Sequence, residues 1–261
     1  MFVPPNNRLR WASAALLGAT LEGFFPNYCY LCGLRSYRDQ PLCTACQCNL
    51  SSNEYCCSRC ALPLPGPALQ VLPICTERTQ LCGQCLNSPP AFDRVIAPWL
   101  YDEQLAFLLH RWKFHRERRL SRMFAHLWLS RLNEDPELPD TILPVPLHWS
   151  KLWRRGFNQS ELLAVALRKQ CQVLQTVTLG TGLVQRHRAT SAQSRLSAAQ
   201  RVSNMRGAFT ARQRCDNLRI AIVDDVLTTG ATASSLATTL RDAGASTIEI
   251  WCLARTPEPQ H

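Results

Sequence analysis

The pattern of apolar and polar positions along the chain changes near residue 90. Beyond this point, apolar strand-like runs alternate with helix-like segments, and Gly244 is expected to end the last helix. Strands are predicted over residues 94–100, 141–147, 218–223 and 246–253. Helices are predicted over residues 158–170 and 231–243, with one or two more over residues 102–132. This alternation is typical of an α/β fold with a parallel sheet.

The first ninety residues lack this alternation. Residues 1–28 are expected to form a helix that ends at Pro26. Their basic start and apolar run are similar to an export signal, but Glu22 interrupts the run and no clear cleavage site follows, so a short amphipathic helix is favoured. Residues 29–90 are rich in cysteine, proline and turn residues. We therefore expect three parts: a helix over 1–28, a cysteine-rich module over 29–90 and an α/β domain over 91–261.

Charge favours anionic partners. The chain has 261 residues, a net charge of +10 and a pI near 9.1. Residues 151–214 carry twelve Lys or Arg residues and one acid, Glu161. A solvated surface normally mixes signs, so this segment is a candidate for binding phosphates, nucleotides or nucleic acid; solubility alone is the alternative. No apolar run approaches the roughly 20 residues of a membrane span, so we expect a cytoplasmic protein that is not an integral membrane protein.

Cysteine spacing indicates metal binding. Eleven of the fourteen cysteines lie between residues 29 and 85, and four C-x-x-C pairs are typical of zinc sites in a reducing compartment. The expected ligands are Cys29, Cys32, Cys43, Cys46, Cys57, Cys60, Cys82 and Cys85. Pairing in sequence order would give two structural zinc sites, each with four thiolates. A crossed pairing, replacement of Cys57 by Cys56, and free buried thiols stay open as alternatives.

A second segment combines an apolar strand, two acids and a loop suited to phosphate. Residues 220–223 form a continuous apolar run, Asp224 and Asp225 follow it, and residues 228–232 then lead into a predicted helix. Ligands bind at the carboxyl ends of parallel strands. The carboxylates suit a vicinal diol and a divalent cation, and the N–H groups that begin the helix suit a phosphate. An ordinary strand–turn–helix is the alternative, but it leaves the paired acids unexplained.

Residues 223–232 resemble the phosphoribosyl diphosphate motif of type I phosphoribosyltransferases: a hydrophobic strand, two acids, two hydrophobic residues and T-T-G-x-T. The resemblance implies that Asp224 and Asp225 hold the ribose hydroxyls. It also implies a cradle for the 5-phosphate, formed by Thr228, Thr229, Gly230, Ala231 and Thr232.

Three further stretches resemble the ComF family, also seen as the GntX proteins of DNA utilisation. They are residues 144–148 (PVPLH), residues 154–159 (RRGFNQ) and a polar stretch over residues 188–209. With the cysteine pairs, the likeness spans nearly the whole chain. It implies a double zinc ribbon followed by a type I phosphoribosyltransferase fold, and a link with DNA uptake and use.

In related transferases, the loop after the strand that ends near Pro146 contacts pyrophosphate. By this likeness Lys151, Arg154 and Arg155 would supply charge, with Arg154 and Arg155 as the candidate catalytic residues, because arginine suits bidentate phosphate contacts. Asn158 is expected to cap the next helix. A solvated basic turn is the alternative. Residues 188–209 are expected to close over bound substrate as a loop, or to form a plain surface loop.

Two functions follow. An enzyme would bind magnesium phosphoribosyl diphosphate and transfer phosphoribosyl to a nitrogen acceptor, although no residue identifies the acceptor or its general base. A binding protein would instead sense the diphosphate without turning it over, while its zinc ribbons and basic surface hold single-stranded DNA. Residues 110–122, where Trp112 and Phe114 lie among basic residues, suit such binding, although helical aromatic residues are more often core. A structural adaptor of DNA-uptake machinery is a third alternative.

Overall fold

The computed structural model describes residues 26–65, 80–115, 117–131, 138–187 and 207–257. Contacts divide the chain into two compact units, Met1–Leu50 and Ser51–His261. The predicted helix over residues 1–28 lies almost entirely outside the described residues, as do most of the polar stretch 188–209 and the spare cysteine Cys75. The expected boundaries of the three parts stay a prediction.

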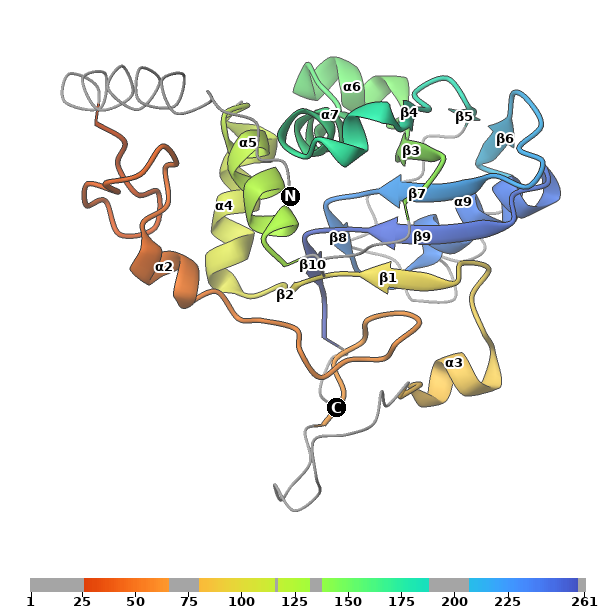
Figure 1. The fold of residues 1–261 in the computed structure, drawn as a ribbon, viewed down its shortest axis with the longest axis horizontal. Helices are drawn as coiled ribbons and strands as arrows, with labels where there is room; N and C mark the ends of the chain where they lie inside the picture. Colours follow the sequence, from red (N-terminus) through yellow and green to blue (C-terminus); the bar gives the residue numbers. More distant parts are fainter. Residues whose placement is uncertain (1–25, 66–79, 116, 132–137, 188–206, 258–261) are drawn as a thin grey trace, which may run out of the picture. The chain divides into compact units, whose positions relative to one another are not determined.

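The second unit is built on a parallel sheet. Among the described residues, five strands form it in the order β1 (Arg94–Ile96), β9 (Thr247–Trp251), β7 (Arg219–Val223), β3 (Thr141–Pro144) and β4 (Thr178–Leu179). Every neighbouring pair is parallel (Figure 1). Strand β7 is buried from Ile220 to Val223, as its continuous apolar run predicts for a central parallel strand. The predicted α/β fold with a parallel sheet is confirmed.

Three of these strands break at the same level and then resume. Strands β2 (Trp99–Leu100), β10 (Ala254–Arg255) and β8 (Val226–Leu227) form a short parallel sheet whose order repeats that of β1, β9 and β7. The expected strand over residues 94–100 was wrong in this respect, since it is interrupted between β1 and β2, whereas the expected strand over residues 246–253 is observed as β9 and ends at Trp251. Between β7 and β8, the interruption consists of Asp224 and Asp225.

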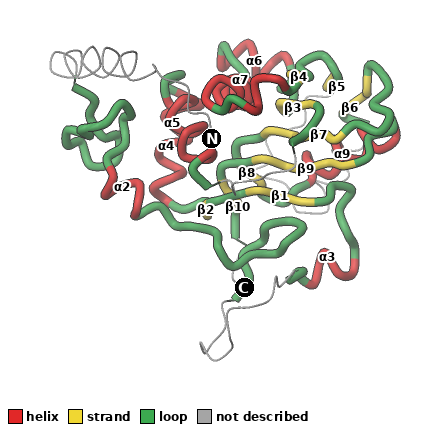
Figure 2. Tube along the Cα trace, viewed as in Figure 1, coloured by secondary structure: helices red, strands yellow, loops and turns green. Residues whose placement is uncertain are grey.

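Helices lie on both faces of the sheet (Figure 2). The predicted ones are α4 (Glu103–Phe114), α5 (Leu120–Leu129), α7 (Gln159–Gln170) and α9 (Ala231–Asp242). Asn158 caps α7 as predicted, because its side chain accepts a hydrogen bond from the Ser160 N–H at 3.1 Å. In the part of the chain that is described, no helix has both the length and the apolar character needed to cross a membrane.

Several short elements were not predicted. Helix α6 (Trp149–Arg155) replaces the expected basic loop; His148 caps its start, and Gly156, with a φ of +78°, ends it. The others are α2 (Thr44–Cys48), α3 (Gly83–Asn87), the 3-10 helix η1 (Val173–Thr176) and the antiparallel pair β5 (Val184–Arg186) and β6 (Phe209–Ala211). These elements are too short to produce a clear periodic pattern.

Apolar side chains fill both faces of the sheet. On one face, Leu236 and Leu240 of α9 share a core with Ile220 and Ile222 of β7. On helix α5, Trp128 packs against the Trp251 ring at 4.8 Å between centroids, and its indole N–H donates to the Cys252 carbonyl at 3.2 Å. This hydrogen bond satisfies a carbonyl in the break between β9 and β10.

Gly244 follows α9 as predicted and adopts a φ of +106°. A Cβ atom at this position would lie 3.1 Å from the backbone Cα atom of Asp216 and closer still to its carboxylate. We expect Gly244→Ala to lower the free energy of unfolding by about 1–3 kcal/mol, through strain at positive φ and this steric clash. Urea unfolding will measure the loss. The control is Gly182→Ala, where nothing lies within 4 Å of the added atom; equal losses would contradict the explanation.

Candidate functional site

A cavity of about 310 Å³ opens at the break between β7 and β8. Asp224, Asp225 and all of residues 228–232 line it, so the structure brings together every residue of the predicted phosphoribosyl diphosphate site. The cavity also receives side chains from α4, α6 and β5. The carboxyl end of a central parallel strand is where an open α/β sheet binds its ligand.

The two carboxylates have different partners. Lys113 Nζ forms an ion pair with Asp225, and the Ser160 hydroxyl donates to Asp224 Oδ1 at 3.1 Å. Burial and the adjacent Asp225 carboxylate raise the pKa of Asp224. Burial would also raise the pKa of Asp225, but the Lys113 ammonium and the Val226 N–H lower it below its ordinary value. Lys113 therefore compensates the charge of Asp225, and a cation brought by a ligand would favour ionisation of both carboxyl groups.

Three more cationic side chains line the cavity. Lys151 and Arg155 lie one turn apart on α6, and Arg186 comes from β5. Burial, and next the positive charge of Arg186, lowers the pKa of Lys151. A bound anion would relieve this repulsion, so the cavity suits a phosphate or pyrophosphate group. Of the two predicted catalytic arginines, only Arg155 lines the cavity, whereas Arg154 is exposed on α6.

The loop between β8 and α9 has the expected form. Gly230, with a φ of +74°, is the N-cap of the 12-residue helix α9 and has no side chain that could cap the first turn. The Ser234 N–H donates to the Gly230 carbonyl at 2.8 Å, which closes the first turn. Backbone N–H groups of the first turn are orphan donors that can bind a phosphate.

Sequence reasoning missed the partners of the carboxylates. It placed Lys113 in a basic surface segment, although Lys113 falls four positions after the buried Leu109 on the apolar face of α4. That spacing was the available signal. Trp112, expected as a base-stacking candidate, is fully buried and donates to the Ser121 hydroxyl at 2.9 Å. Trp112 is thus a core residue, as the alternative interpretation held.

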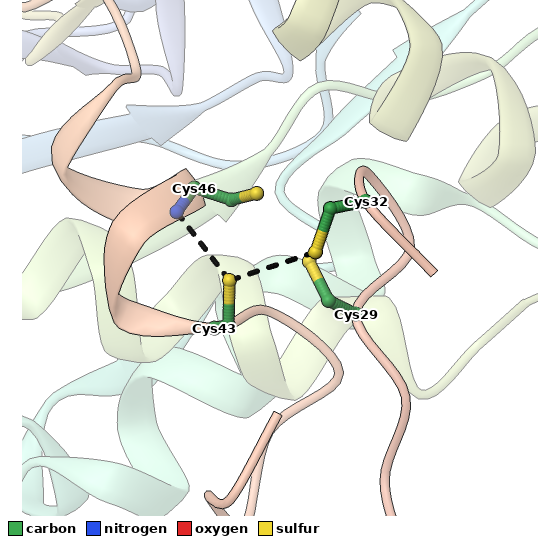
Figure 3. Close-up of side chains that lie close together, drawn as sticks. All are labelled: Cys29, Cys32, Cys43 and Cys46. Atoms are coloured by element: carbon green, nitrogen blue, oxygen red, sulfur yellow. Dashed lines mark hydrogen bonds between the residues drawn. The ribbon is translucent and has the colours of Figure 1, made fainter. Parts of the chain in front are cut away.

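The cysteines form two groups of four, paired in sequence order. Figure 3 shows the first group, Cys29, Cys32, Cys43 and Cys46, in the unit Met1–Leu50. The sulfur atoms within each group lie within 4.8 Å of one another, and the Cys46 N–H donates to Cys43 Sγ at 3.5 Å. Burial would raise the pKa of Cys29, but backbone N–H groups lower it to about 7. Four clustered thiols with such donors fit a structural zinc ion.

The second group, Cys57, Cys60, Cys82 and Cys85, is entirely buried in the unit Ser51–His261. Its Cys60 and Cys82 sulfur atoms lie 3.6 Å apart, and the Cys82 N–H donates to Cys57 Sγ at 3.3 Å. All four share one core with α9 and β7. The crossed pairing is not found, and Cys56 stays outside the group. This donor set also fits zinc, and it lies inside the α/β unit.

Relatives among known proteins identify the family of this chain. The chain is 35% identical over 240 residues to the DNA utilization protein YhgH of Salmonella typhimurium, covering 88% of this chain and 98% of that protein. It is 32% identical over 244 residues to Competence protein F of Haemophilus influenzae, covering 90% and 100%. The chain belongs to the ComF/GntX family. No family model matches it.

The ComF/GntX chain has a type I phosphoribosyltransferase fold joined to a double zinc-ribbon arrangement of cysteines. Two solved structures are similar to it. The purine phosphoribosyltransferase of Pyrococcus horikoshii is 16% identical, with a TM-score of 0.27, and covers 57% of this chain and 91% of that chain. The adenine phosphoribosyltransferase of Leishmania tarentolae is 15% identical, with a TM-score of 0.32, and covers 61% and 77%. The parallel strand order and the two acids that follow β7 are consistent with this fold.

We expect two zinc ions per chain, one in each group of four thiolates, because each group completes the tetrahedral sulfur shell that zinc prefers. Elemental analysis of protein purified without added metal will measure the ratio. Cys32→Ser and Cys85→Ser should each lower it to about one, and Cys48→Ser, outside both groups, should leave it unchanged. A wild-type ratio near one would contradict the two-site arrangement.

Proposed function

We propose that the chain binds the magnesium complex of phosphoribosyl diphosphate in the cavity after β7 and transfers its phosphoribosyl group to a nitrogen acceptor. One observation carries the proposal: paired carboxylates, three cations and the N-terminus of α9 all line one cavity. Magnesium phosphoribosyl diphosphate matches all of these features. Its phosphates suit the cations and the N-terminus of α9, and its vicinal diol and divalent cation suit the carboxylates. A simple phosphate would leave Asp224 and Asp225 without a role.

In this proposal, the ribose hydroxyls donate to Asp224 and Asp225, and the N–H groups of residues 228–232 donate to the 5-phosphate. Lys151, Arg155 and Arg186 contact the pyrophosphate; exposed Arg154 does not. As the bond from the anomeric carbon to pyrophosphate breaks, positive charge develops on the ribose ring and negative charge on the leaving group. The three cations stabilise that leaving group, and the acceptor nitrogen forms the new bond to the same carbon.

The relatives are named DNA utilization protein and Competence protein F. These names favour a role for the proposed activity in the uptake or use of DNA, and they favour DNA-uptake machinery as a partner. We extend both roles to this chain as part of the proposal. A cytoplasmic location stays a prediction.

A second candidate function is a single-stranded-DNA-binding protein that senses the diphosphate without turning it over. Helix α6 favours it, because Trp149 and Trp153 expose 71% and 89% of their surface while another side of the helix lines the cavity. Exposed indole rings can stack on bases. Arg154, also exposed on α6, can contact a phosphate that joins two such bases. This surface suits the role better than residues 110–122, where Trp112 is buried.

We expect wild-type protein to bind phosphoribosyl diphosphate only with magnesium present, and isothermal titration calorimetry will measure the affinity. Asp225→Asn should weaken binding by about 1–3 kcal/mol, the contribution of a charge-assisted hydrogen bond. Gly230→Val should weaken it further, since φ is +74° there and the added side chain fills space left for the phosphate. Release of pyrophosphate on adding candidate nitrogen bases will separate the transferase from the sensor.

Asp216→Asn is the matched control, because Asp216 is exposed, pairs with Arg214 and does not line the cavity. It should bind the ligand as the wild type does. Absence of binding at millimolar ligand by folded, zinc-loaded protein would rule out both the transferase and the sensor.

For DNA, we expect Trp153→Ala to weaken binding of a labelled single-stranded oligonucleotide by about 1–3 kcal/mol, the contribution of one stacked base. Affinity should also fall steeply with salt. Fluorescence anisotropy will measure both. The control is Phe107→Ala, which removes an exposed aromatic ring from helix α4. Equal losses in the two variants, or binding that ignores salt, would contradict a DNA site on α6.

A further inference from the structure

Arg255 is a buried arginine whose hydrogen bonds run in two directions. It lies on β10, and its surface is 7% exposed. Its Nε donates to the Cys60 carbonyl at 3.1 Å. Its Nη1 donates to the Leu227 carbonyl at 3.1 Å and also to the Thr228 carbonyl. One side chain therefore connects the second cysteine group to the start of the phosphate loop.

The surroundings of Arg255 supply carbonyl acceptors rather than a carboxylate. Its Nη1 also donates to the Thr256 carbonyl at 2.8 Å, and within the described ranges it forms no ion pair with an acid. Burial of an unpaired guanidinium is costly. A zinc ion bound by four thiolates carries a net charge of −2, and Cys60 is one of its expected ligands. With zinc bound, the second cysteine group would thus place a negative charge beside the Cys60 carbonyl, where it compensates the positive charge of Arg255.

The carbonyls that Arg255 contacts belong to two segments with different roles. Cys60 lies in the knuckle that would hold the metal, whereas Leu227 ends β8 and Thr228 begins the predicted 5-phosphate cradle. The planar guanidinium reaches acceptors on both sides at once, which a lysine ammonium cannot do in the same geometry. A movement of the Cys60 carbonyl would therefore displace the rigid guanidinium of Arg255, and with it the start of the phosphate loop.

We propose that Arg255 is a positioning residue that makes ligand binding at the phosphate loop depend on metal in the second cysteine group and not in the first. The inference rests on the proposed binding of phosphoribosyl diphosphate. The first group lies in Met1–Leu50, a separate compact unit, whereas the second shares a core with α9. The two metal sites thus have different tasks: the first stabilises its own unit, and the second also fixes the loop.

The first test replaces the guanidinium and keeps the charge. Arg255→Lys should fold and keep two zinc ions per chain, but should bind magnesium phosphoribosyl diphosphate about tenfold more weakly, because buried carbonyls lose their shared donor. The matched control is Arg241→Lys. Arg241 also donates to backbone carbonyls, those of Ala91, Ala245 and Ser246, and pairs with Asp93, but none of these partners belongs to a cysteine group or to the phosphate loop. Calorimetry should give this control the wild-type affinity.

Hydrogen exchange measured without ligand adds a readout that does not depend on the proposed function. Amides of residues 227–232 should exchange faster in Arg255→Lys than in wild type, with zinc content unchanged. If these amides and the ligand affinity both match the wild type, the proposal is overturned. If wild-type protein itself fails to bind the ligand while the exchange still differs, the proposed function fails and the positioning role stands.

A further test removes one expected metal ligand from each cysteine group in turn and compares the two variants. Cys32→Ser should lose one zinc ion and keep the wild-type ligand affinity, whereas Cys85→Ser should lose one zinc ion and at least tenfold in affinity. Arg255→Lys added to Cys85→Ser should weaken binding little further, since both changes remove the same connection. Equal losses from Cys32→Ser and Cys85→Ser would contradict the proposal. If Cys85→Ser does not fold, Arg255→Lys with both metals bound decides the question.

Discussion

Two adjacent carboxylates inside a strand break impose the main constraint on this molecule. Carboxylates out of contact with water are costly unless cations or hydrogen-bond donors compensate them. Helix α4 brings Lys113 to Asp225, and α7 brings Ser160 to Asp224. Segments far apart in the chain are therefore fixed over the same break. The placement of α4 and α7 satisfies this electrostatic requirement while burying their apolar faces.

The two cysteine groups show how one motif takes part in different kinds of structure. Both have C-x-x-C pairs and both place four sulfur atoms together. Cys32 of the first group is exposed, whereas the whole second group lies in the core beneath α9. The spacing of the pairs is a local property and determines the metal shell. Burial depends on the rest of the chain, so spacing alone does not distinguish a partly exposed cysteine group from one built into the core of the α/β unit.

The sequence predicted features that depend on residues close together in the chain, and it missed features that depend on tertiary contacts. Helices α7 and α9 were predicted because each has a long pattern and a recognisable end: Asn158 caps the first and Gly244 follows the second. The cysteine pairing and the acid–loop segment were predicted because their residues are close in sequence. Helix α6 was not, since seven residues give little periodicity. The spacing from Leu109 places Lys113 on the buried face of α4, but the partners of Lys113 and Arg255 depend on tertiary proximity and are not encoded by local spacing.

Chain order has a consequence for how the sheet assembles. Strand β9 pairs with both β1 and β7, so a strand synthesised after both of its neighbours lies between them in the sheet. Until it emerges from the ribosome, β1 has no neighbour, and apolar surface that β9 will cover stays open to water. The cysteines of the second group have all been made well before then and need only a short loop to close. Metal capture can thus precede sheet closure, and a chain that stops short of Thr247 keeps its thiolates but lacks the strand that joins the two halves of its core.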